Sequence, residues 1–307
     1  MAVLRSWMFV PGNQQRKLDK AAQLRADVIV YDLEDAVPAV EKEHARQAVS
    51  AAMRQQDVRL SYVRVNDTEG PWWSGDLEAV VQASLKGIML PKASNAAQIA
   101  LVDERLSQLE RKAGISEGTV DLVPLIESAE GVFRAYELAG CCRRVRRLAF
   151  GSLDYTLDVN GRWTEDGAEL LYPRSQLVVH SRAAGIEAPV DAAYIRMHDE
   201  AGLRKDTNLS RQLGFQGRLV IHPAQLDPVN ETFSPTAEEI DEARQVIEAY
   251  RLAAAEGVAA IQWNGKMVDL PVVRRCSKLL EAASELGLAS LDQDEGDEGE
   301  WTIQARA

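Results

Sequence analysis

The sequence predicts a (β/α)8 barrel, in which eight parallel strands alternate with eight helices. Two observations lead to this prediction. Short apolar runs alternate eight times with segments of helical period within roughly the first 255 of the 307 residues. Polar or charged residues directly follow most of these runs, which is where such a barrel carries its functional groups. A doubly wound open sheet is the alternative for the same alternation.

The first four strand–helix pairs begin at Trp7. Pro11-Gly12-Asn13 is a turn that starts the first helix, and Asp27 to Asp32 is an almost unbroken apolar run of the kind buried on both faces of a parallel sheet. We expect strands at 7–10, 27–32, 59–65 and 87–90, and helices at 13–24, 38–53, 72–84 and 95–113.

The second four pairs continue the alternation with strands at 120–126, 146–151, 188–190 and 218–221, and helices at 129–139, 167–184, 200–213 and 237–255. Beyond them, 257–271 has no clear period and 272–286 has the pattern of a helix. Residues 292–300 carry six acids and two glycines, typical of a solvated, mobile tail. The sequence therefore predicts a barrel domain at 1–255, a C-terminal extension at 256–290 and an acidic tail at 291–307.

Composition narrows the class of protein. An apolar content of 46% with 27% charged residues is that of a soluble globular protein. The net charge of -12 argues against a binder of nucleic acids or anionic membranes, which needs a broad basic surface. Cys141, Cys142 and Cys276 form neither a metal-binding spacing nor an even disulfide set, so we expect free thiols. With no leader-like apolar segment and no run of 18 apolar residues, we expect a cytoplasmic protein.

Two acids mark a candidate metal site. Asp121 to Ser128 is an apolar run that ends on Glu127, and Arg147 to Asp154 repeats the design one strand later. Each acid alone could be a helix cap or a surface residue, but parallel neighbouring strands would present both at the same end of the barrel. Hard carboxylate ligands that leave other coordination positions open to water and substrate suit Mg²⁺. We therefore expect Glu127 and Asp154 to bind Mg²⁺.

Other strand ends supply charged neighbours. Arg64 ends the third strand, and its guanidinium can pair with a substrate carboxylate or a developing oxyanion. Asp32, Glu34 and Asp35 end the second strand. These three acids are expected to hold waters or the arginine; the alternative is a helix-capping acidic turn.

Nine short segments, in unbroken order over residues 4–285, together resemble the citrate lyase beta subunit and malyl-CoA lyase family. They are Arg5-Ser-Trp-Met-Phe-Val-Pro-Gly12, Asp32-Leu-Glu-Asp-Ala-Val37, Val63-Arg-Val-Asn66, Leu90-Pro-Lys92, Pro124-Leu-Ile-Glu-Ser128, Phe150-Gly-Ser-Leu-Asp154, Gly214-Phe-Gln-Gly217, Ile221-His-Pro-Ala-Gln225 and Gly265-Lys-Met-Val-Asp-Leu-Pro271.

The resemblance implies a Mg²⁺-dependent carbon–carbon lyase that cleaves a 3-hydroxyacyl-CoA of the citryl-, citramalyl- or malyl-CoA type into an acyl-CoA and a 2-keto acid. It implies a (β/α)8 barrel that forms a trimer or hexamer. The positions matching Glu127 and Asp154 hold the metal, and the position matching Arg64 binds the keto acid. The position matching Asp269 is the acid/base, contributed across a subunit interface; from the residues alone, Asp269 is a cap before Pro271.

The resemblance also implies a CoA-binding region, at the Pro-Gly turn with its basic helix and at the Ile-His-Pro segment. These correspond here to Arg16, Lys20 and His222. Arg16, Lys17 and Lys20 form a small basic patch on an otherwise acidic protein.

Three functions remain open from the sequence. One is a stand-alone lyase acting on a free CoA thioester. A second is the subunit of a citrate lyase complex, whose citryl group is carried by a protein. The third is a thioester hydrolase with the same metal and Asp269, or a homologue that only binds CoA; the presence of the four expected site residues argues against the last.

Overall fold

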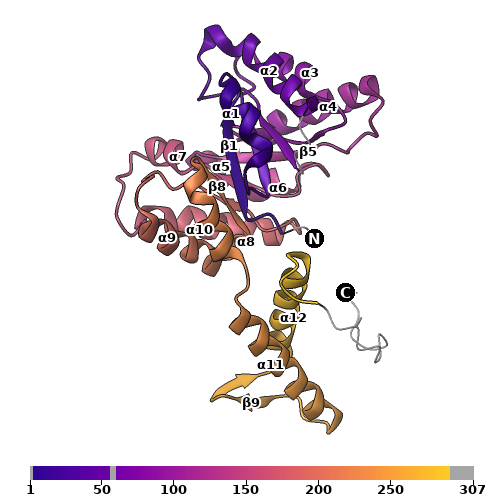
Figure 1. Cartoon of the computed structure of the whole chain (residues 1–307), viewed down its shortest axis with the longest axis vertical. Coiled ribbons are helices and arrows are strands. Elements are labelled where there is room, and N and C mark those ends of the chain that lie inside the picture. Colours follow the sequence, from indigo (N-terminus) through magenta and orange to yellow (C-terminus); the bar gives the residue numbers. More distant parts are fainter. Residues whose placement is uncertain (1–2, 56–59, 291–307) are drawn as a thin grey trace. The chain divides into compact units, whose positions relative to one another are not determined.

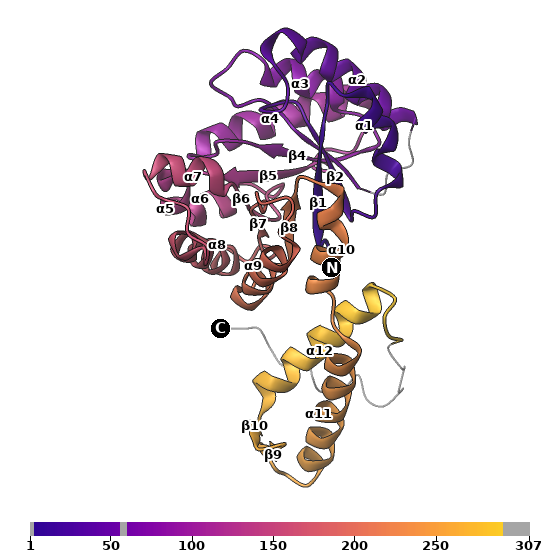
Figure 2. The same ribbon diagram turned by 60° about the vertical axis from the view of Figure 1, so that its left-hand side comes forward.

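The computed structural model describes residues 3–55 and 60–290, and eight of its strands close into a parallel barrel (Figures 1 and 2). Each strand pairs with the next, and β8 pairs back onto β1. The predicted (β/α)8 fold is confirmed. The strands are β1 (Ser6–Pro11), β2 (Val28–Asp32), β3 (Ser61–Arg64), β4 (Leu85–Leu90), β5 (Asp121–Ile126), β6 (Ala149–Phe150), β7 (Val190–Asp191) and β8 (Gly217–Val220).

Successive residues of a barrel strand face opposite sides, and β2 shows the rule. Val28 and Val30 belong to a cluster with Trp7 and Tyr62, whereas Ile29 and Tyr31 belong to the larger cluster shared with the surrounding helices. Every residue of β2 is buried, as expected from its unbroken apolar sequence.

Helices follow the strands around the barrel. They are α1 (Gln15–Lys20), η1 (Ala21–Gln23), η2 (Ala39–Glu41), α2 (Lys42–Gln55), α3 (Trp73–Val80), α4 (Ala96–Ala113), α5 (Ala129–Phe133), α6 (Ala135–Gly140), α7 (Ser152–Asp158), η3 (Ala168–Leu170), α8 (Leu171–Ala183), α9 (Glu200–Leu213), η4 (Pro223–Gln225) and α10 (Leu226–Phe233). Where caps are strong, the predicted bounds hold: Asn95 forms a capping box with Gln98, and α4 ends at Gly114 with φ 70°.

The helix after β8 differs from the prediction. The sequence pattern assigned this position to 237–255, but α10 follows β8 instead. The two prolines in 223–228 argue against a helix in this segment. Pro228 nevertheless lies in the first turn of α10, where a missing backbone N–H is tolerated. The helix α11 (Ala237–Ala255) has the predicted bounds but packs in a different unit.

The chain divides into two compact units at Phe233 and Ser234. The barrel unit spans residues 4–233, and the C-terminal unit contains α11, the hairpin β9 (Ile261–Trp263) and β10 (Lys266–Val268), and α12 (Leu270–Glu285). The hairpin lies in the segment for which the sequence showed no period. A small cluster of Val246, Tyr250, Val268 and Val273 forms the buried core of this unit. The predicted acidic tail at 291–307 lies outside the described residues.

Cys141, Cys142 and Cys276 are free thiols, as expected. In the described ranges, no helix combines the length and hydrophobicity that crossing a bilayer requires. The barrel wall near β8 contains buried ion pairs, in which Arg174 and Arg218 share Asp191 and Asp206.

Candidate functional site

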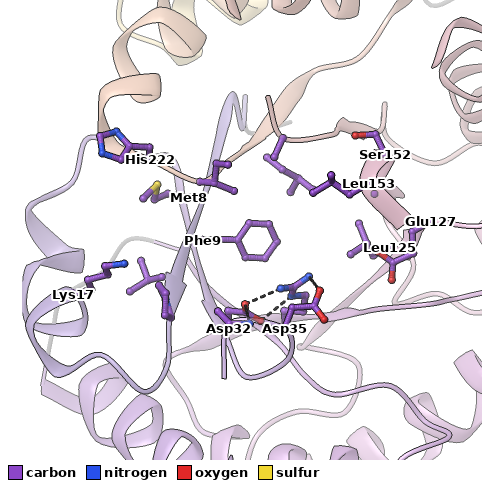
Figure 3. Close-up of a pocket in the computed structure, with 18 of the residues that line it drawn as sticks. Met8, Phe9, Lys17, Asp32, Asp35, Leu125, Glu127, Ser152, Leu153 and His222 are labelled. Carbon is purple, nitrogen blue, oxygen red and sulfur yellow. Dashed lines mark hydrogen bonds and ion pairs between the residues drawn. The ribbon is translucent and has the colours of Figure 1, made fainter. Parts of the chain in front are cut away.

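The carboxyl ends of the strands surround a cavity of about 770 Å³, within the roughly 300 to 1,000 Å³ usual for small-molecule sites. Figure 3 shows Glu127 on one side of this cavity and Lys17 and His222 on the other, with Phe9 between them. Seven of the predicted site residues line it: Lys20, Asp32, Asp35, Arg64, Glu127, Asp154 and His222. The cavity therefore has an acidic end and a basic end.

Glu127 directly follows β5 and is buried. The main-chain N–H of Lys92 donates to its Oε1 at 2.6 Å. Burial raises the pKa of Glu127 to about 8, and the negative charges of Glu34 and Asp154 add to the effect. Without a cation, the ionised form of this carboxylate is disfavoured.

Asp154 reaches the same cavity from the first turn of α7, just after β6. The turn before it is built on Gly151, whose N–H donates to the Ile126 carbonyl at 2.8 Å. A Cβ on Gly151 would lie 2.6 Å from Glu127 Oε2, closer than real contacts allow. Glycine lets the backbone pass beside Glu127, so both carboxylates can face one space.

This pair fits a hard divalent cation. A carboxylate disfavoured by burial and by two neighbouring acids gains strongly from a cation. Among the residues that the structure describes, no group of three His, Cys, Asp or Glu side chains is arranged to hold a metal. The two carboxylates would leave most of an octahedral shell to water and substrate, an arrangement typical of Mg²⁺.

Arg64 is held on three sides. Its Nε and Nη2 donate to the two oxygens of Asp32 at 2.8 and 2.7 Å, and its guanidinium lies over the ring of Phe9 at 4.7 Å. Its Nη1 faces Glu34 at 3.2 Å and the exposed Asp35 at 3.4 Å. Burial alone would lower the pKa of Arg64, but these acids, Asp32 above all, raise it. The fork is fixed on Asp32, and on the Nη1 side a ligand carboxylate would take the place of the exposed Asp35.

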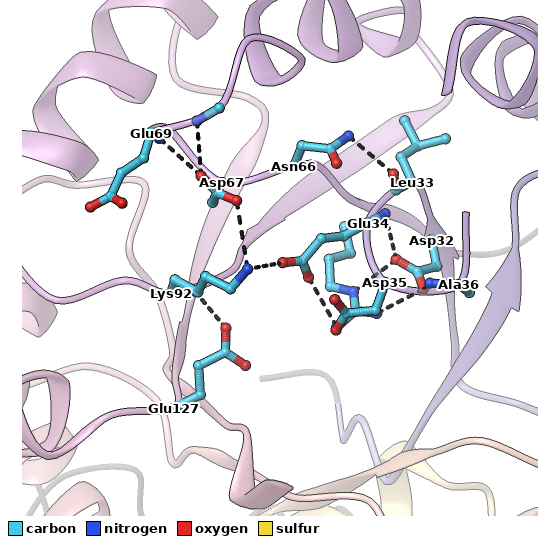
Figure 4. Close-up of polar contacts among 12 residues, drawn as sticks. Asp32, Leu33, Glu34, Asp35, Ala36, Asn66, Asp67, Glu69, Lys92 and Glu127 are labelled. Carbon is cyan, nitrogen blue, oxygen red and sulfur yellow. Dashed lines mark hydrogen bonds and ion pairs between the residues drawn. The ribbon is translucent and has the colours of Figure 1, made fainter. Parts of the chain in front are cut away.

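Lys92 connects the carboxylates of Glu34 and Asp67 to Glu127 (Figure 4). Its Nζ lies 3.1 Å from Glu34 Oε1 and 3.6 Å from Asp67 Oδ2. Its backbone has φ 51°, a left-handed conformation that strains a residue with a side chain. Lys92 lies just after the end of β4 at Leu90, and this position is the signal that could have marked it, although no role was predicted for it.

A second cavity of about 300 Å³ shares Glu127 and Asp154 with the first. Lys92 is the cation in its lining, which also includes Asp67, Glu69, Glu130 and Asp158. The carboxylate pair therefore lies between two cavities of different character.

The basic end is formed by α1 and by the turn after β8. Lys17 and Lys20 line the cavity, whereas the exposed Arg16 does not. His222 caps η4, and its Nδ1 accepts from the Ala224 N–H at 3.2 Å. With Nδ1 accepting, the neutral imidazole carries its proton on Nε2, which can donate to a ligand.

Asp269 lies in the C-terminal unit, at the N-terminus of α12. Its Oδ1 accepts from the Val272 N–H at 3.4 Å, so the side chain caps the helix.

Glu34, like Arg16, lies outside the lining of the 770 Å³ cavity, although Glu34 contacts Arg64.

Comparison with known proteins identifies relatives over most of the chain. Residues 5–223 match the family model described as HpcH/HpaI aldolase/citrate lyase, and residues 175–286 match a model described as a C–C bond lyase of the TIM-barrel fold. The citrate lyase subunit beta of Leuconostoc mesenteroides subsp. cremoris is 38% identical over 91% of this chain and 93% of its own. A (3S)-malyl-CoA thioesterase of Cereibacter sphaeroides is 34% identical over 86% of this chain and 89% of its own.

Solved structures agree with these matches. The structure of the protein CitE from Mycobacterium tuberculosis, in complex with magnesium, acetoacetate and coenzyme A, superposes with a TM-score of 0.74 at 29% identity. The alignment covers 92% of this chain and 99% of that one.

Proposed function

The chain belongs to the HpcH/HpaI aldolase/citrate lyase family of carbon–carbon lyases, and from this premise we propose that it cleaves a 3-hydroxyacyl-CoA thioester with the help of Mg²⁺. The products are an acyl-CoA and a 2-keto acid such as oxaloacetate, pyruvate or glyoxylate. One observation carries the proposal: two carboxylates, Glu127 and Asp154, line a single cavity with the guanidinium of Arg64.

The acidic end of the cavity accounts for the cleavage of the carbon–carbon bond. Mg²⁺, when bound by Glu127 and Asp154, supplies Lewis-acid stabilisation of negative charge on oxygen. Arg64 binds the carboxylate of the 2-hydroxy acid end of the substrate at the Nη1 position that the exposed Asp35 occupies here, and it orients the carbon that carries the hydroxyl. A base takes the hydroxyl proton, the C=O of the keto acid forms, and the bond to the α-carbon of the thioester breaks.

The electron pair of that bond leaves as the thioester enolate. We propose that Asp269 from a neighbouring subunit protonates the α-carbon, giving the acyl-CoA, and removes the same proton in the condensation direction. This role requires a homo-oligomer, which we propose to be a trimer or hexamer. Capping of α12 occupies one face of the Asp269 carboxylate and fixes its direction.

The basic end suits CoA. Lys17 and His222 lie across the cavity from Glu127, and Lys20 also lines the cavity. Such cations and an N–H donor can bind phosphates. The apolar residues between the two ends suit the chain of a thioester. Arg16, exposed on α1, would contact only a part of CoA that extends outside the cavity. We further propose a cytoplasmic location, in agreement with the free thiols.

Two relatives favour other functions than cleavage of a free CoA thioester. The citrate lyase subunit match favours a citryl thioester carried by a protein partner. The thioesterase match favours hydrolysis, in which the same site directs water at the thioester carbonyl and no carbon–carbon bond breaks.

One experiment separates these functions. The protein is incubated with Mg²⁺ and citryl-, citramalyl- or malyl-CoA, or with a carrier-bound citryl thioester, and keto acid, acyl-CoA and free CoA are measured together. A lyase yields keto acid and acyl-CoA in equal amounts, whereas a thioesterase yields free CoA and no keto acid. We expect equal keto acid and acyl-CoA, lost in excess chelator and restored by Mg²⁺ or Mn²⁺. Turnover that survives chelation would show that the chemistry needs no metal, and turnover only on a carrier-bound thioester would favour the complex.

Replacing Arg64 by Lys tests the keto-acid end. Lysine keeps the charge but loses the planar fork that Asp32 holds, so we expect keto-acid binding to weaken by about 1 to 3 kcal/mol. The KM of the condensation reaction for the keto acid reports the change, with the KM for acyl-CoA as the internal control. An unchanged KM for the keto acid would mean that another group binds its carboxylate.

A further inference from the structure

Glu34 is a buried carboxylate to which the proposed chemistry gives no role. It is 4% exposed, and its two oxygens face two cations from different strand ends. Oε2 lies 3.2 Å from Arg64 Nη1, and Oε1 lies 3.1 Å from Lys92 Nζ (Figure 4). A buried carboxylate is stable in ionised form only with such partners.

The backbone beneath Glu34 is also fixed. The buried Lys42 of α2 donates from Nζ to the carbonyls of Leu33 at 2.8 Å and Glu34 at 2.7 Å. Asn66 donates to the Leu33 carbonyl at 3.0 Å. The loop after β2 is therefore held from α2 and from the segment that follows β3, and it presents Glu34 in one direction.

The contacts of Glu34 form a continuous series. Arg64 is the proposed ligand for the keto acid, and Lys92 holds the proposed metal ligand Glu127 through its main-chain N–H. The strained backbone of Lys92 persists only if its surroundings fix it, and the ion pair with Glu34 is one of the contacts that do so.

We propose that Glu34 is a positioning residue that sets the separation between the carboxylate-binding Arg64 and the metal ligand Glu127. This inference rests on the proposed function and adds to it. Glu34 does not line the large cavity, so it acts through Arg64 and Lys92 rather than on the substrate. Residues of this kind behind metal ligands typically change metal affinity or activity by about 10- to 100-fold when replaced.

The test uses Glu34→Gln, Lys92→Met and the double variant. Gln keeps the shape of Glu34 without its charge, and Met keeps the main-chain N–H of Lys92. Mn²⁺ is titrated into the metal-free protein and followed by electron paramagnetic resonance, and kcat and KM are measured separately. Because burial raises the pKa of Glu34 to about 7, against the lowering effect of Arg64, we use about pH 8, where the carboxylate is ionised.

We expect each single variant to bind Mn²⁺ and turn over about 10- to 100-fold less well. We expect the double variant to bind Mn²⁺ and turn over no worse than the poorer single variant, since both substitutions remove the same ion pair between Glu34 and Lys92. Asp67→Asn is the matched control: it removes one charge beside the same ammonium, without contact to Arg64, and Asn can still accept from the Glu69 and Gly70 N–H groups. We expect at most about a fivefold effect there, the range for an exposed pair.

Three results would overturn the inference: wild-type Mn²⁺ affinity in Glu34→Gln, independent effects that multiply in the double variant, or an equal loss in Asp67→Asn. If Glu34→Gln does not fold, Lys92→Met decides, because it alters a half-exposed side chain: lost Mn²⁺ affinity supports the link and unchanged affinity refutes it. The Mn²⁺ titration requires no turnover. A protein inactive on every thioester would therefore refute the proposed function while the titration still decides the role of Glu34.

Discussion

Glu127→Gln is expected to lower kcat/KM by on the order of 10³-fold or more and to abolish the response to Mg²⁺, because one of two ligand charges is lost. Gln can still accept the hydrogen bond from the Lys92 N–H, so the loop geometry survives the change. The measurement is turnover against Mg²⁺ concentration. Glu137→Gln, an exposed acid on α6 paired with Arg134, serves as the control that leaves turnover unchanged.

The same variant is expected to stabilise the metal-free protein. The pKa of Glu127 is raised to about 8 when folded, from 4.5. A raised acid pKa contributes stability that is fully present below pH 4.5 and is lost as pH rises through about 8. Above that pH wild type carries a buried charge that Gln lacks, so the Tm of metal-free Glu127→Gln should be higher there. Full Mg²⁺-dependent activity would contradict the metal assignment, and a Tm that falls above about pH 8 would contradict the raised pKa of Glu127.

Asp269→Asn is expected to be nearly inactive alone, and activity is expected to return when it is mixed with Glu127→Gln. Asn is as good a helix cap as Asp, so α12 should keep its N-terminus. If Asp269 acts on a neighbouring subunit, some interfaces of a mixed oligomer combine an intact Glu127 with an intact Asp269. Random mixing in equal amounts makes this about one quarter of all sites in a cyclic oligomer.

The measurement is specific activity after dissociation and reassembly, with hybrid oligomers verified by mass. Each variant taken alone through the same cycle is the control. Confirmed hybrids without recovered activity would show that Asp269 works within its own chain or takes no part in the reaction.

The sequence predicted those features that depend on short stretches of chain. β2 was found because all of its residues are buried, and α9 and α11 because their caps and periods agree. Glu127 and Asp154 were expected to lie together because a barrel strand ends in its functional groups, and both line one cavity. The assignment of α11 to the barrel was wrong, since periodicity identifies a helix but not its packing partner.

The side-chain contacts within the site could not be predicted from the sequence in the same way. The fork of Arg64 on Asp32 joins the ends of two strands, and Lys92, with its strained backbone, contacts both Glu127 and Glu34. Such contacts between distant residues leave no period in the sequence. Strand-end position alone suggested which residues meet, not how they are bonded.

The close approach of Gly151 to Glu127 gives a criterion for sorting relatives of this protein. Any side chain at position 151 would place its Cβ against the carboxylate, so Glu127 could not keep its present rotamer. A homologous chain that retains both acids but has lost this glycine should therefore bind the metal poorly. Among relatives that retain both acids, an uncharged residue that takes no part in the reaction would mark which chains can bind the metal.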